Sequence, residues 1–237
     1  KRQGLDASLW KGLVRLNANY FVTNTEGLLA QPQNYPSYFQ TYYPKSDMRP
    51  YINMNNQRRT GVDLSVNVGK KHGDFEWNVG LVGMYYTSKN TKWDENVKYD
   101  WLKAEGEAID ALRGYQCIGF FKDAADVESS AKVNANTKPG DLKYVDQNND
   151  GVINEQDQVV LGKWGASWVM GLNLTAKYKG FTLFVAGTGS FGGKGLKNNS
   201  YMHVYGDRKY SEVVRGRWTE ETADIATYPR LTTQGGD

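Results

Sequence analysis

Apolar and polar residues alternate with a period of two along paired segments of the chain. The clearest run is 166–178, in which every even position is apolar or aromatic and most odd positions are small or polar. Only Lys179 and Gly180 separate this run from a second alternating segment, 181–191. A period of two is typical of a β-strand with one apolar and one polar face. The pair therefore predicts an antiparallel hairpin closed by a tight turn, where glycine can take a positive φ.

The same unit occurs twice more. Segments 60–69 and 75–81 alternate on either side of a turn at 71–74. Near the start, segments 5–9 and 14–22 flank a turn at Lys11-Gly12. Three hairpins, and hence about six strands, are predicted, several of them longer than the five or six residues or so that are usual in soluble proteins.

Long connections separate the hairpins, at about 25–58, 91–165 and 192–237. Because short and long connections alternate, every tight turn falls at one end of the sheet and every long loop at the other. This asymmetry is typical of outer-membrane β-barrels, with short periplasmic turns and long extracellular loops. We expect an all-β fold, part of a large antiparallel transmembrane β-barrel.

A soluble β-sandwich is the alternative, because alternation also arises where one face of a sheet packs on a core. Loops of this length in strict alternation with tight turns are uncommon in such domains. Single-chain barrels start at about eight strands, and the chain ends in Gly235-Gly236-Asp237 without a closing strand. We therefore expect this sequence to be a piece of a longer barrel.

The composition supports an all-β fold and removes several functions. The chain has 16 Tyr, 7 Trp, 8 Phe and 26 Gly, which is rich in aromatic and turn residues. No apolar stretch is long enough for a transmembrane helix, and no signal-peptide core follows the basic start. The single cysteine, Cys117, excludes a disulfide framework, and His72 and His203 lack metal-ligand spacing. A net charge of +3 is too small to argue for a nucleic-acid partner.

Nothing in the chain indicates an enzyme. No phosphate-binding loop, nucleophile elbow or histidine-based triad is present. Asp94 and Glu95 have the residue types of a glycosidase pair, but a charged surface loop explains them better.

Segment 146–157 has the ligand spacing of a calcium loop. Oxygen donors fall at positions 1, 3 and 5, a glycine at 6, and a carboxylate at 12, as in an EF-hand loop with Asp in place of the final Glu. No amphipathic helix precedes it, so a structural Ca²⁺ is expected and not a sensor. The alternative is a metal-free turn rich in Asn and Asp. The expected ligands are Asp146, Asn148, Asp150, the carbonyl of Val152, and Asp157.

The segment that leads into this loop resembles a hallmark of one transporter family. Residues 139–146, Pro-Gly-Asp-Leu-Lys-Tyr-Val-Asp, resemble the PGDIKYxD run of the SusC/RagA family of TonB-dependent outer-membrane transporters, with Leu142 in place of the usual Ile. Weaker resemblances to family segments follow the family order along the chain, at 60–64, 105–109, 114–121, 178–183, 217–219 and 228–231.

The resemblance implies a 22-stranded barrel with an N-terminal plug, of which this chain would be part of the C-terminal half. Members import glycans or peptides across the outer membrane of Bacteroidetes. A SusD-like surface lipoprotein caps the mouth of the barrel, and TonB supplies energy through a region outside this sequence. The plug domain, the TonB box and the last strands are absent from the sequence given.

This interpretation assigns the two faces of the strands. Apolar positions meet outer-membrane lipid, with an aromatic girdle near the tight turns formed by Trp10, Trp77, Tyr178 and Phe181. The residues expected to line the lumen are Asn17, Asn19, Asn67, Asn78, Asn173 and Thr175. Loop aromatics could stack on an oligosaccharide or peptide substrate, and the candidates are Tyr38, Tyr42, Tyr43, Trp93 and Trp101. A soluble, calcium-stabilised carbohydrate-binding β-domain is the alternative function.

Overall fold

The computed structural model describes residues 1–34, 36, 40–41, 46–47, 49–197, 201–202 and 211–232. The chain divides into two compact units. The first, here called the sheet unit, comprises Lys1–Ala111 and Gly162–Lys194. The second, here called the loop unit, comprises Leu112–Leu161 and Gly195–Asp237.

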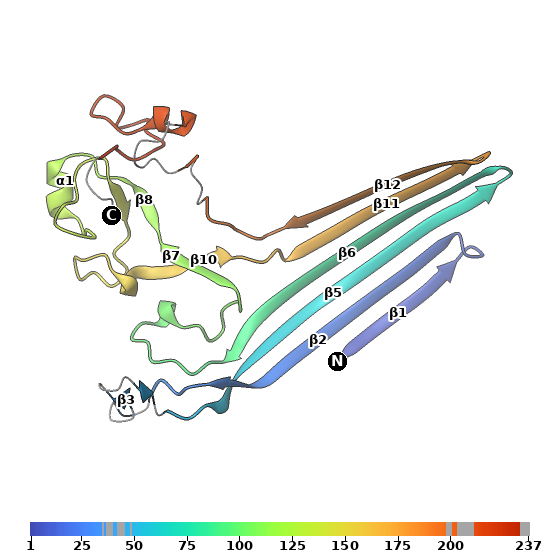
Figure 1. Cartoon of the computed structure of the whole chain (residues 1–237), viewed down its shortest axis with the longest axis horizontal. Coiled ribbons are helices and arrows are strands. Elements are labelled where there is room, and N and C mark those ends of the chain that lie inside the picture. The colour runs from blue at the N-terminus through green and yellow to red at the C-terminus, as the bar shows by residue number, and fades with distance from the viewer. Residues whose placement is uncertain are drawn as a thin grey trace. The chain divides into compact units, whose positions relative to one another are not determined.

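The sheet unit is built on one antiparallel sheet with the strand order β1-β2-β5-β6-β11-β12 (Figure 1). Every neighbouring pair is antiparallel. The three predicted hairpins are therefore confirmed, as is the predicted part of a large antiparallel barrel, although six strands leave the barrel open. The strands are β1 (Arg2–Leu9), β2 (Val14–Ala30), β5 (Ile52–His72), β6 (Phe75–Lys92), β11 (Trp168–Tyr178) and β12 (Phe181–Phe191).

Positive φ angles close the three hairpins. Lys179 and Gly180 have φ of 42° and 86°, which matches the twist of the flanking strands in a two-residue turn. Gly73 has φ of 58° and shares its turn with Asp74 alone, so this turn is shorter than the predicted 71–74. The first turn is longer than the predicted Lys11-Gly12, because Trp10 also takes a positive φ of 51°.

Two strands run further than alternation predicted. β2 continues to Ala30 and β5 begins at Ile52, so the connection between them is shorter than the expected range of about 25–58. A register shift between Thr25 and Leu28 interrupts the pairing of these strands. Gly27 lies inside the shift with φ of 68°, and its N–H donates to Oδ1 of Asn56 at 3.0 Å. A bulge of this kind breaks the period of two, which explains why the strand ends looked like loop.

The connection expected at 91–165 contains ordered structure, and its parts 91–111 and 162–165 belong to the sheet unit. Strands β7 and β10 pair, as do β8 and β9. Asp123 caps the helix α1 by accepting a hydrogen bond from the N–H of Asp126 at 2.8 Å. The elements are the 3₁₀ helix η2 (Asp100–Leu102), β7 (Ala111–Tyr115), β8 (Cys117–Phe120), α1 (Ala124–Ser129), β9 (Leu142–Tyr144), the 3₁₀ helix η3 (Glu155–Asp157) and β10 (Gln158–Lys163).

Three short elements complete the described chain. β3 (Gln40–Thr41) and β4 (Ser46–Asp47) pair with each other between β2 and β5. The 3₁₀ helix η4 (Glu212–Gly216) follows β12. No helix among the described residues is long and apolar enough to cross a bilayer.

The hydrophobic core lies in the loop unit. Among the residues that the structure describes, the buried hydrophobic side chains all belong to it: Leu112, Phe121, Val127, Ile153 and Val214. Within its described part, the sheet unit has no buried Val, Leu, Ile, Met or aromatic side chain. The long strands therefore form a single sheet layer that does not enclose a hydrophobic core.

Candidate functional site

One face of the sheet is apolar over its central rows. The register places Leu64, Leu81 and Leu172 on this face, where 48%, 52% and 45% of each residue is exposed. Apolar area left in water costs about 25 cal/mol per Å² relative to burial, so this face favours an apolar surrounding. Two of its cross-strand rows are Leu5, Ala18, Leu64, Gly83, Met170 and Gly189, and Ala7, Leu16, Val66, Leu81, Leu172 and Gly187.

The opposite face is polar and hydrogen-bonded across strands. Asn19 donates to Oδ1 of Asn17 and to Oδ1 of Asp63, each at 2.6 Å, and Asn17 donates to Asp6. All six residues predicted to line the lumen lie on this face by register: Asn17, Asn19, Asn67, Asn78, Asn173 and Thr175. The two faces match the apolar exterior and polar interior of an outer-membrane barrel.

Aromatic residues gather beside two of the tight turns. Tyr178 pairs with Phe75 on one side and with Phe181 on the other, and 81% of Phe181 is exposed. Trp77 lies two residues along β6 from Phe75, and Trp10 is 72% exposed in the first turn. The predicted girdle residues therefore lie at the turn end of the sheet, where aromatic side chains meet the membrane interface in barrels.

A cavity of about 370 Å³ opens on the polar face, towards the ends of the strands that lie away from the tight turns. Its polar groups are the guanidinium of Arg59, the carboxylate of Asp110 and the hydroxyls of Tyr86 and Ser88. Asp110 accepts hydrogen bonds from the N–H of Gly165 at 2.6 Å and from Oγ of Ser88 at 3.5 Å. The remaining lining residues are Phe21, Met84 and Ile109.

In the predicted calcium loop, backbone N–H groups donate hydrogen bonds to the aspartate side chains of the same loop. Asp146 Oδ2 accepts from Gly151 at 2.8 Å, and Asp150 Oδ1 accepts from Val152 at 2.9 Å. Asp157 is fully buried; its Oδ1 accepts from Gln147 at 2.9 Å and its Oδ2 from Asn154 at 2.8 Å. These bonds are those of a turn stabilised by Asn and Asp side chains.

This arrangement differs from that of a formed metal centre. In the part of the chain that the structure describes, no three His, Cys, Asp or Glu side chains group closely enough to hold a metal ion. The donor chemistry still suits Ca²⁺, because Asp146, Asn148, Asp150 and the Val152 carbonyl all supply hard oxygens. Ca²⁺ at this loop therefore stays a prediction.

The hallmark segment contacts a distant part of the loop unit. Asp141 forms an ion pair with Arg230, with Nε 2.5 Å from Oδ1, and Nη2 of Arg230 donates to Oδ2 at 3.0 Å. The N–H of Arg230 also donates to the carbonyl of Gly140 at 2.9 Å. Gly140 has φ of 87°, and a Cβ there would collide with the ring of Trp218. Three of the segments that resemble the family, 139–146, 217–219 and 228–231, thus meet in one cluster, here called the clasp.

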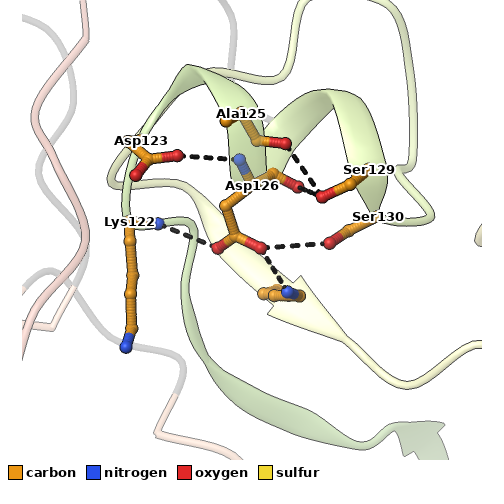
Figure 2. Close-up of polar contacts among 7 residues, drawn as sticks. Lys122, Asp123, Ala125, Asp126, Ser129 and Ser130 are labelled. Atoms are coloured by element: carbon orange, nitrogen blue, oxygen red, sulfur yellow. Dashed lines mark hydrogen bonds and ion pairs between the residues drawn. The ribbon is translucent and has the colours of Figure 1, made fainter.

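A second charged contact ties α1 to β9 (Figure 2). Asp126 Oδ1 accepts from Lys143 Nζ at 2.6 Å and from Ser130 Oγ at 3.1 Å, while Oδ2 accepts from the N–H of Lys122 at 3.1 Å. The ammonium of Lys143, followed by the Lys122 N–H, lowers the pKa of Asp126 below its ordinary value. The carboxylate is therefore charged at neutral pH and holds α1 in place.

Of the aromatic residues predicted to bind substrate, the two that the structure describes, Trp93 and Trp101, do not line the cavity. Trp101 stacks on Tyr99, with ring centroids 4.6 Å apart and planes at 10°. The N–H of Trp93 donates to Oε2 of Glu105 at 3.2 Å. Tyr38, Tyr42 and Tyr43 lie outside the described residues. Their role in binding stays a prediction.

Sequence reasoning missed the cavity residues Phe21, Arg59, Tyr86 and Asp110. A signal was present, because Phe21 falls in the polar phase of its strand, in step with Asn17 and Asn19. An aromatic residue on a polar face calls for a reason other than lipid contact.

Comparison with known proteins gives sequence relatives of one kind. TonB-dependent receptor P26 of Formosa agariphila is 28% identical over 252 residues, covering 98% of this chain and 24% of the relative. TonB-dependent receptor P3 of the same organism is 24% identical over 206 residues, covering 81% and 20%. The chain thus spans about a quarter or less of these curated relatives. No protein-family model matches the sequence.

Solved structures agree on the fold. The RagAB peptide importer in the open-open state superposes with a TM-score of 0.70 at 17% identity, covering 99% of this chain and 25% of that one. The RagAB peptide transporter gives 0.67 at 16% identity, covering 97% and 25%. Sequence and structure together support the predicted resemblance to the SusC/RagA family, and the fold of the chain matches part of these transporter structures.

Proposed function

We propose that this chain forms part of the barrel wall of a TonB-dependent importer of nutrient oligomers, either glycans or peptides, in the cell outer membrane. The observation that carries the proposal is the two-faced sheet, with apolar cross-strand rows on one side and a hydrogen-bonded polar face on the other. The names of the matched proteins support import: two TonB-dependent receptors and a peptide transporter. The chain would act in transport and not in catalysis.

The importer proposal implies several partners. A SusD-like surface lipoprotein would close the barrel over the long connections, and TonB would act through a region outside this sequence. Outer-membrane lipid would cover the apolar face, and an oligosaccharide or a peptide would be the cargo. No nucleic acid is expected.

The test is purification of the intact polypeptide from its native membrane in detergent. A mass several times the 26.7 kDa of this chain, together with a co-purifying lipoprotein, is expected. A 26.7 kDa protein that stays soluble without detergent would contradict the proposal. It would favour the alternative, a soluble calcium-stabilised carbohydrate-binding β-domain.

We also infer that segment 146–157 binds a structural Ca²⁺. Its support is the ligand spacing together with the sharp turn at Gly151, which has φ of 83°. Binding at 100 times the dissociation constant would stabilise the loop unit by about 2.7 kcal/mol. Asp150→Asn should reduce this calcium-dependent shift in the full-length protein, measured as the change in thermal unfolding on adding Ca²⁺ after chelation.

Glu155→Gln is the matched control, because Glu155 is exposed in the same loop but is not at a predicted ligand position. An equal calcium shift in both variants, or no shift in the unaltered protein, would show that the loop is a metal-free turn.

A further inference from the structure

The cavity on the polar face is assembled from three strands and the segment that precedes β7. Phe21, Arg59 and Ser88 lie on the same face by register, since Arg59 pairs with Ser88 and Phe21 pairs with Gly61, which pairs with Tyr86. Ile109 and Asp110 close one side. A volume of about 370 Å³ lies within the range of small-ligand pockets. It suits one terminal unit of an oligomer better than a whole chain.

Two cationic side chains lie at or beside this cavity, Arg59 in the lining and Lys163 next to it, against one carboxylate. The guanidinium of Arg59 forms no hydrogen bond or ion pair with any residue that the structure describes, so it is available to a ligand. Lys163 Nζ lies 5.2 Å from the ring centroid of Tyr86, which is also in the lining. Asp110 is the one carboxylate in the lining, and its two oxygens already accept bonds from Gly165 and Ser88. A ligand with an anionic group fits this balance.

The shape of the anion follows from the donor. A guanidinium presents two parallel N–H groups that match a carboxylate, which gives both geometry and charge. Phe21 supplies a flat apolar surface beside it, and its position is set by Gly61: a Cβ there would lie 2.5 Å from Cζ of Phe21. Aromatic faces of this kind pack on sugar rings and on apolar side chains.

We propose that this cavity binds the carboxylate of the terminal unit of the imported oligomer, with Arg59 as the recognising residue. The carboxylate belongs either to the free C-terminus of a peptide or to an acidic sugar. The proposal rests on the importer function above, and it assigns a charge requirement to a site on the barrel wall itself.

Binding to the full-length protein in detergent tests it, measured by calorimetry. The probes are trialanine against trialaninamide, and digalacturonate against its methyl ester. The unaltered protein should bind the acid of one pair about tenfold more tightly than its neutral partner, and which pair responds separates the two sources of the carboxylate. Tenfold is the size expected for one charge-assisted bidentate contact that is partly open to water.

Arg59→Gln should remove this difference between acid and neutral ligand, and Arg59→Lys should retain part of it, because charge remains and the fork is lost. Arg58→Gln is the matched control. Arg58 is the adjacent residue on the opposite face of β5, where it donates to Oδ1 of Asn24 at 3.0 Å. The control should keep the full preference.

The results distinguish a failure of the cavity proposal from a failure of the importer proposal. An unchanged preference in Arg59→Gln, or tight binding of both neutral ligands, overturns the cavity proposal. If none of the four probes binds while cells still import an uncharged oligomer, the cavity proposal falls and the importer stands. Failure to import any oligomer contradicts the proposed function itself.

Discussion

The sheet unit and the loop unit obey opposite rules of burial. The loop unit encloses Phe121, which is 1% exposed, and Asp157, which is fully buried, as a small water-soluble domain does. The sheet unit leaves Leu81 52% exposed and Phe181 81% exposed on one continuous apolar face. The two units of the chain are therefore stabilised in different ways. The loop unit depends on its own core and ion pairs, and the sheet depends on the medium that surrounds it.

The largest effect should come from emptying the core of the loop unit. Phe121→Ala should destabilise this unit by about 3–5 kcal/mol, because a buried aromatic ring leaves a cavity. Limited proteolysis should then cut within 112–161 while the barrel stays folded. Ile118→Ala, on the neighbouring strand β8 and 55% exposed, should have little effect. If both variants resist protease equally, the loop unit does not depend on this core.

The sheet should respond to charge on one face only. Leu81→Arg places a guanidinium on the apolar face and should cost about 2–4 kcal/mol near the bilayer midplane. Val82→Arg, the next residue and on the polar face by register, should be tolerated. The fraction of folded barrel after extraction, seen as heat-modifiable migration on a gel, measures both. Equal losses would mean that the two faces do not meet different surroundings.

The clasp of the hallmark segment should contribute less. Arg230→Met removes the partly buried ion-pair and hydrogen-bond partner of Asp141 and should cost about 2 kcal/mol. Hydrogen exchange should rise at Gly140 and at Trp218, whose ring packs there. The control is Lys103→Met, which removes a partner of the fully exposed Asp100 and should leave exchange unchanged. If the clasp does not stabilise the loop unit, hydrogen exchange should be the same in the two variants.

The smallest effect should be a pH dependence of the α1–β9 contact. Because the folded-state pKa of Asp126 is lowered, its contribution is present above the unfolded pKa, near the ordinary 3.8, and is lost as pH falls through the lower folded value. Asp126→Asn should weaken the contact at neutral pH and flatten this acid limb. Glu128→Gln, exposed on the same helix, should keep it. Exchange of the α1 amides against pH provides the measurement.

The hairpins were predictable because their signals are local. The turn at Lys179-Gly180 is two residues long and directly follows the alternating run 166–178. The faces observed in the structure are those that this alternation predicts. The bulge at Gly27 was not predictable from alternation, because it breaks the period on which the prediction rests. In the loop unit the sequence predicted the loop at 146–157 but none of the strands, since these are too short to show a period.

Alternation along each strand was enough to assign the two faces of the sheet, because a residue's face depends only on whether its position is odd or even. Which residues contact one another depends on how the whole chain folds. Asp141 and Arg230 lie 89 positions apart, and Phe21, Arg59 and Asp110 reach one cavity from separate segments. Such meetings depend on strand register and on the closure of long connections, and neither is encoded in any short stretch of the chain.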